Sequence, residues 1–111
     1  MKETEIKKIV KETIKELMKA GSLLSANEIA YREISSTLYA YFYNGRTDYN
    51  INIALEKYKN DKYFKIIQLF FDYRYTIEAI AEEYAVEPST ITRNKKRLCL
   101  SIHKDLELNK N

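Results

Sequence analysis

The stretch Thr76–Leu98, TIEAIAEEYAVEPSTITRNKKRL, changes from acidic to basic at the only proline of the chain, Pro88. Residues 76–88 hold four Glu and no Lys or Arg, whereas residues 89–104 hold five Lys or Arg and no Asp or Glu. A residue before a proline avoids helical angles, and a proline suits the first position of a helix, which needs no amide donor. The stretch is therefore predicted to form two helices, joined by a tight turn just before Pro88.

Apolar residues fall at helical spacing in both predicted helices. They are Ile77, Ile80, Ala81 and Tyr84 in the first helix, and Ile91, Leu98 and Ile102 in the second. Thr76 suits the N-cap of the first helix, Ala81 is small enough for the point where two helices touch, and Val86 can fill the turn. This pattern is typical of a helix-turn-helix, a motif whose second helix lies in the major groove of DNA.

The second helix has a polar and basic face opposite its apolar residues. A rotation of about 100° per residue from Ile91 identifies the side chains that point outward. These are Ser89, Thr92, Arg93 and Lys96, with Thr90 and Arg97 on one flank. Lys and Arg displace counterions from phosphates, and Arg, Ser and Thr also hydrogen-bond base edges. We expect Arg93 to read a base and Arg97 to contact the DNA backbone. The complete set of predicted DNA-binding residues is Ser89, Thr90, Thr92, Arg93, Lys95, Lys96 and Arg97.

The earlier part of the chain also has helical patterns. Residues 4–19 are amphipathic, and a second helix is predicted to begin near Ser25, where Ser25 and Glu28 can form a capping box. The inner stripe of that second helix is Ile34, Leu38 and Tyr41, joined by Tyr31 and Phe42.

Two more helices are predicted before Thr76. The letters NGRTD indicate a turn. Asp48 or Asn50 then begins a third helix that runs to about Lys59, and Asn60 or Asp61 begins a fourth, KYFKIIQLFFDYRY. This fourth helix is apolar on more than one face, so it should lie centrally in the fold.

The composition indicates an all-α protein. The 111 residues include only two Gly and one Pro, which leaves few breakers of helices. We expect one small helical domain, 1–111, with N-terminal helices in 1–59 for oligomerisation or partner binding and a helix-turn-helix region in 60–106. The net charge is only +3, so DNA binding is inferred from the distribution of charge and not from its total.

Residues 60–104 resemble the domain of bacterial sigma factors that recognises the upstream promoter element. They are more similar still to the sigma-like, ArpU-type transcriptional regulators of phages of low-G+C Gram-positive bacteria. Those proteins join a helix of the DKYFKIIQLFF kind to IAEEY…STITRNKKRL. The resemblance implies regulation of phage or mobile-element genes, with host RNA polymerase as a partner. The chain departs from the family pattern at Ala85, where glycine is frequent, at Glu87, where Ser or Asp is usual, and at Asn94 and Lys95, where many relatives are apolar.

No enzyme activity, cofactor or metal site is predicted. Cys99 and His103 are four residues apart on one helix, but two ligands make a weak site, and structural zinc takes four. Cys99 is expected at the edge of the core and His103 in solvent. A single cysteine and the lack of a run of about 20 apolar residues predict a protein of the reducing cytoplasm that does not enter the membrane.

The leading hypothesis for function is a sequence-specific transcriptional regulator that binds duplex DNA. We expect a homodimer, because such motifs usually read two half-sites. The alternatives are a sigma-like accessory factor of RNA polymerase, a small terminase-like component of DNA packaging, and a purely protein-binding helical module. An accessory factor would need RNA polymerase in order to bind DNA, and a terminase-like component would have the mass of a ring. A protein-binding module would lack salt-sensitive DNA affinity.

Overall fold

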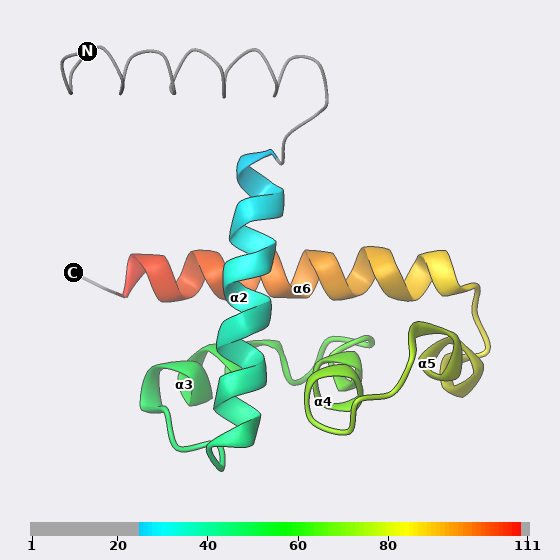
Figure 1. The fold of residues 1–111 in the computed structure, drawn as a ribbon, viewed down its shortest axis with the longest axis horizontal. Coiled ribbons are helices and arrows are strands. Elements are labelled where there is room, and N and C mark those ends of the chain that lie inside the picture. Colours follow the sequence, from blue (N-terminus) through cyan, green and yellow to red (C-terminus); the bar gives the residue numbers. More distant parts are fainter. Residues whose placement is uncertain (1–24, 110–111) are drawn as a thin grey trace, which may run out of the picture.

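The computed structural model describes residues 25–109, and every regular element in that range is a helix (Figure 1). The helices are α2 (Ala26–Tyr43), α3 (Tyr49–Tyr58), α4 (Lys65–Phe71), α5 (Ile77–Tyr84) and α6 (Pro88–Leu108). The prediction of an all-α fold is confirmed. The amphipathic pattern at 4–19 lies outside the described residues. Within residues 25–109, no helix combines the length and the apolar character needed to cross a bilayer.

The longest helix, α6, is the axis around which the other helices pack. In Figure 1, α2 crosses α6 near its middle, and α3, α4 and α5 lie in a row along one side of α6. All four of these helices contact α6, and the contact between α2 and α6 is the most extensive. Helices from the first half of the chain therefore hold the same long helix that the predicted helix-turn-helix supplies.

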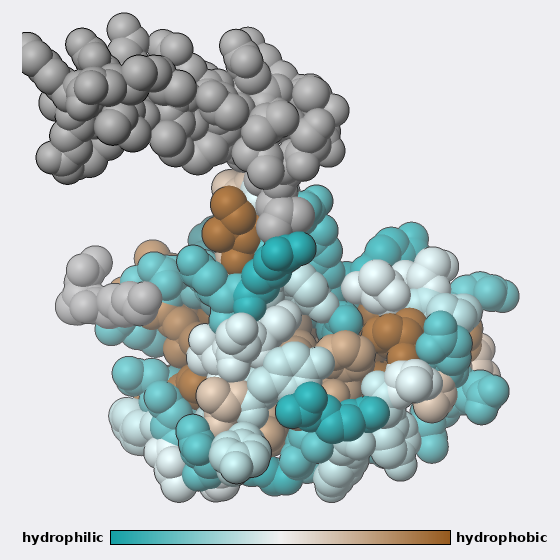
Figure 2. All heavy atoms as spheres, viewed as in Figure 1, coloured by the Kyte–Doolittle hydropathy of each residue, from teal (hydrophilic) through white to brown (hydrophobic). Residues whose placement is uncertain are grey.

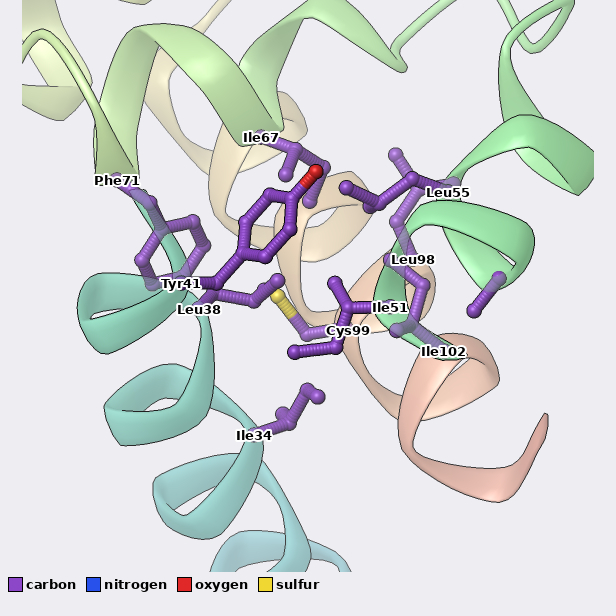
Figure 3. Packing of buried hydrophobic residues seen from close by; sticks show 11 residues of the cluster. Ile34, Leu38, Tyr41, Ile51, Leu55, Ile67, Phe71, Leu98, Cys99 and Ile102 are labelled. Atoms are coloured by element: carbon purple, nitrogen blue, oxygen red, sulfur yellow. The ribbon is translucent and has the colours of Figure 1, made fainter. Parts of the chain in front are cut away.

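The larger part of the core lies where α2, α3, α4 and α6 meet (Figure 3). Its buried residues are Ile34, Leu38, Tyr41, Ile51, Ala54, Leu55, Ile67, Phe71, Leu98, Cys99 and Ile102. The predicted inner stripe of α2 and the inward positions of α6 are confirmed, because their side chains are all nearly inaccessible to solvent. Residues from both predicted parts of the chain thus share this one cluster.

A second cluster joins α4 to the two helices of the predicted helix-turn-helix. Its buried residues are Ile66, Leu69, Ile80, Ala81 and Ile91. Helix α4 thus buries residues in both clusters, since Ile67 and Phe71 belong to the first. The prediction that the fourth helix lies centrally is confirmed, as expected for a helix that is apolar on more than one side.

The predicted N-caps at Ser25, Asp48 and Thr76 form, but the fourth helix begins later and ends earlier than expected. Hydroxyl or carboxylate oxygens of Ser25, Asp48 and Thr76 accept backbone N–H bonds at the starts of α2, α3 and α5. Asp61, predicted as a possible start of the fourth helix, instead caps a separate turn, in which its carboxylate accepts the N–H of Tyr63 at 2.9 Å. The helix ends by Phe71, and Arg74 adopts a left-handed backbone with φ of 60°, which an α-helix does not accommodate.

Candidate nucleic-acid interface

The turn between α5 and α6 has the geometry of a Schellman motif. Ala85 is left-handed, with φ of 54° and ψ of 46°. The N–H of Val86 donates to the carbonyl of Ala81 at 3.0 Å, and the N–H of Ala85 donates to that of Glu82 at 3.1 Å. These two bonds satisfy carbonyls that the end of α5 leaves open. The left-handed angle at Ala85 costs an alanine about 1 kcal/mol, because its Cβ comes close to the following carbonyl oxygen.

The turn directs the two helices against each other. Val86 packs against the second cluster, and Ala81 and Ile91 are buried where α5 meets α6. Pro88 occupies the first turn of α6, and Glu87 precedes it without a side-chain capping bond. The sequence prediction of two helices joined just before Pro88 is confirmed, with the small, plugging and anchoring residues in the places expected of them.

The outward face of the first half of α6 carries most of the predicted site residues. Ser89, Thr92, Arg93 and Arg97 are exposed, whereas Thr90 and Lys96 are half-buried. Along the edge of α6 that is turned away from α4 and α5, Figure 2 shows hydrophilic and near-neutral residues. The hydroxyl of Thr92 donates to the carbonyl of Pro88 at 3.2 Å, one turn earlier in the helix. Because Ser89, Thr92 and Arg93 are all exposed on this face, they form one polar surface, and Lys96 lies beside it.

Lys95 does not belong to that surface, and its assignment as a DNA-binding residue is corrected. Its side chain is only 8% exposed, and its Nζ lies 3.7 Å from the centroid of the Phe70 ring and 5.6 Å from that of Tyr31. Burial lowers the pKa of the Lys95 ammonium group. Lys95 follows Ile91 by four residues, so both side chains lie on the same, inward face of α6.

Arg97 is exposed, but its guanidinium is already occupied. Nη1 and Nη2 donate to the two carboxylate oxygens of Asp61 at 2.9 and 3.0 Å. Nε and Nη2 also donate to the side-chain oxygen of Asn94 at 3.2 and 3.1 Å. The bonds from Arg97 hold the pKa of the Asp61 carboxyl below its usual value. Arg97 is thus exposed as expected, but its charge is paired with Asp61, and its predicted contact with the DNA backbone stays a prediction.

Arg93 and Lys96 are basic residues of this half of α6 that take part in no salt bridge among residues 25–109. Nη2 of Arg93 lies 3.5 Å from the Thr90 hydroxyl. Glu78, Glu82 and Glu87 line a shallow hollow beside Val86 and Pro88. These three carboxylates thus share one hollow next to the turn that precedes α6.

Cys99 and His103, which are four residues apart on α6, lie in different surroundings. The thiol of Cys99 is fully buried in the larger cluster, and burial raises its pKa to about 12. Nε2 of the half-buried His103 lies 3.0 Å from a carboxylate oxygen of Glu33 on α2, so the expectation of a solvent-exposed histidine was wrong. No cluster of three or more residues with metal-binding side chains occurs in the described part of the chain.

The contact between Asp61 and Arg97 has no local signal in the sequence, because the two residues are 36 positions apart. The burial of Lys95 does have such a signal, because Lys95 follows the buried Ile91 by one helical turn. Comparisons of the chain with protein-family models, with curated proteins and with solved structures found no match.

Proposed function

We propose that this chain is a sequence-specific transcriptional regulator that binds duplex DNA with the first half of α6 in the major groove. The observation that carries the proposal is the packing of α5 against α6 through the turn at Ala85 and Val86. This packing buries Ile91 and leaves the opposite face of α6 polar, basic and exposed. Helix-turn-helix proteins bind DNA with the corresponding face of their second helix.

The exposed residues divide by the chemistry of their contacts. Arg93 has a planar fork that can pair with two acceptors on the edge of a guanine. Ser89 and Thr92, within one turn of it, can bond base edges or phosphates. Lys96 is a flexible point charge and suits a phosphate. Arg93 is thus the proposed base-reading residue, and Lys96 the proposed backbone contact.

The resemblance of residues 60–104 to ArpU-type regulators supports a role at phage or mobile-element genes, with RNA polymerase as a partner. A catalytic role has no support from the polar residues described above. Arg97 is engaged by Asp61, Lys95 is packed on Phe70, and Cys99 is a buried thiol with a raised pKa.

The test is the salt dependence of DNA affinity, measured by fluorescence anisotropy of the full chain on a duplex selected from random DNA. The plot of log K against log salt has a negative slope. Lys96→Ala should make this slope less steep by about 0.9, the value for one lost phosphate contact. Lys104→Ala is the matched control, because it removes the same charge from an exposed position farther along α6. It should leave the slope nearly unchanged.

Affinity of the parent protein that stays flat between about 50 and 200 mM salt would contradict DNA binding through this helix. An equal effect of the two lysine substitutions would contradict the proposed placement of the first half of α6.

A further inference from the structure

We propose that Asp61 is a positioning residue for DNA recognition, which acts through Arg97 and Asn94 on the first turns of α6. The inference rests on the proposed function and adds a specificity determinant outside the helix-turn-helix. Asp61 lies in the turn between α3 and α4, and it is joined to the carbonyl of Thr90 by a continuous chain of hydrogen bonds. We call this chain, formed by Asp61, Arg97, Asn94 and Thr90, the Asp61 relay.

The first member of the relay is held firmly by its own turn. One carboxylate oxygen of Asp61 accepts the N–H of Tyr63 at 2.9 Å. The backbone of Asp61 donates to Tyr58 at 2.9 Å and accepts from Phe64 at 3.0 Å. The same turn is also braced against α5, because the rings of Tyr63 and Tyr84 lie 5.2 Å apart. The turn between α3 and α4 and its contact with α5 thus fix the position of the Asp61 carboxylate, which is the group that Arg97 of α6 binds.

The second member, Arg97, uses the two edges of its guanidinium for two different partners. The end formed by Nη1 and Nη2 faces the carboxylate of Asp61, and the side formed by Nε and Nη2 faces the amide oxygen of Asn94. Four of the five N–H groups of an arginine can be used in this way. Such an arrangement depends on a rigid, planar fork, which lysine lacks.

The last members, Asn94 and Thr90, are half-buried and lie beside the proposed reading surface. The amide nitrogen of Asn94 donates to the carbonyl of Thr90 at 2.8 Å. Residues 90, 94 and 97 are spaced four and three apart, so they lie on one flank of α6. On the adjacent face, about 100° around the helix, Ile91 and Lys95 are buried against the core. The apolar packing and the relay therefore hold α6 on two adjacent faces and fix its rotation about its own axis.

The rotation of α6 about its own axis sets the position of the Arg93 side chain, because Arg93 projects from the same two turns as the relay residues. A side-chain atom about 6 Å from the helix axis moves by about 1 Å when the helix turns by 10°. Hydrogen bonds from N–H to O occupy a window of only about 0.5 Å, so such a shift weakens a two-bond contact to a base. Contacts to phosphate tolerate the same shift, because they depend mainly on charge.

The Asp61 relay and a direct contact between Arg97 and a DNA phosphate predict different effects of substitution. Arg97→Lys keeps the charge but loses the fork, and Asp61→Asn keeps the size but loses the ion pair. Both should reduce the ratio of affinities for a selected site over scrambled DNA by about fivefold or more, the loss expected for one weakened base contact. Asp72→Asn is the matched control, since it removes a carboxylate that pairs with Arg46 at 2.6 Å, outside α6.

The experiment measures that ratio and the salt slope for each variant at a temperature where circular dichroism shows all of them folded. A merely structural role would weaken both DNAs alike, and would leave the ratio unchanged. An unchanged ratio in Asp61→Asn and Arg97→Lys overturns the proposal. So does Arg97→Ala with an unchanged ratio and a salt slope lowered by about 0.9, because that result makes Arg97 a phosphate contact.

Hydrogen exchange in the free protein separates this proposal from the proposed function. In Asp61→Asn, the amides of residues 93–97 should exchange several-fold faster than in Asp72→Asn, whereas amides in the buried part around Ile102 should not change. Failure of the parent protein to prefer any duplex would refute the proposed function alone. Unchanged exchange at residues 93–97 would refute the relay, whatever the protein binds.

Discussion

Replacement of Lys95 by methionine should stabilise the protein, although it removes a charge that has a favourable contact. Lys95 is 8% exposed, and its ammonium group lies over the Phe70 ring with no salt bridge among residues 25–109. Taking an ion out of water costs several kcal/mol, whereas a desolvated cation–π contact returns about 2 kcal/mol. Methionine fits a similar volume and adds about 0.8 kcal/mol of apolar burial. We expect a net gain of about 1–2 kcal/mol.

The assay is urea unfolding followed by circular dichroism, with Lys96→Met as the half-buried neighbour that should change stability by no more than about 0.5 kcal/mol. The lowered pKa of Lys95 also predicts the pH dependence. Between the folded pKa and the unfolded value of about 10.4, the unfolded state binds more protons, so the parent protein gains stability as pH rises. The advantage of Lys95→Met should therefore shrink toward pH 10. A loss of more than about 1 kcal/mol at pH 7 would refute the reasoning, because the contact with Phe70 would then outweigh the cost of burial.

The remaining predictions concern the turn, the relay and the assembly. Ala85→Gly should raise stability by about 1 kcal/mol in the same urea assay, because glycine adopts the left-handed angle without strain; a loss of stability would contradict this. Asp61→Asn should destabilise at pH 7 and converge on the parent protein in acid. The folded pKa of Asp61 is lowered, so its contribution is present above the unfolded value of about 3.9 and is lost as pH falls through the folded value; a gap that persists at pH 2 would count against the ion pair. Light scattering at tens of micromolar should give the mass of a dimer, as expected for a protein that reads two half-sites, and a monomer mass would rule this out.

The parts of the fold that could be predicted from the sequence are those that depend on neighbouring residues. Ser25, Asp48 and Thr76 cap helices through oxygens three residues from the N–H that they accept, so their role is local. Pro88 begins α6 for an equally local reason, since its ring prevents the preceding residue from being helical. Helical periodicity likewise identified Ile91 and its inward-facing partners.

The parts that could not be predicted depend on which distant residues meet. Nothing near Asp61 in the sequence indicates that it pairs with Arg97, and nothing near His103 indicates Glu33, which is 70 residues away. Helix α4 ends at Phe71, earlier than its apolar pattern suggests, and the left-handed angle at Arg74 keeps the helix from continuing through that residue. The wrong prediction that Lys95 is an exposed DNA-binding residue has a different cause. Its place one turn after Ile91 indicated burial, but its charge suggested exposure.

The most direct test of sequence reading by α6 is the selection of bound sites from random duplex DNA by the full chain and by its Arg93→Ala variant. Arg93 is exposed on the outward face, so its loss should leave the fold intact, which circular dichroism can check. We predict that the parent protein enriches a defined site and that the variant loses preference at one base position, with a cost of about 1–3 kcal/mol on the original site. Identical site preferences for the two proteins, or a uniform loss of affinity on selected and scrambled DNA, would contradict the assignment of Arg93 as the residue that reads a base.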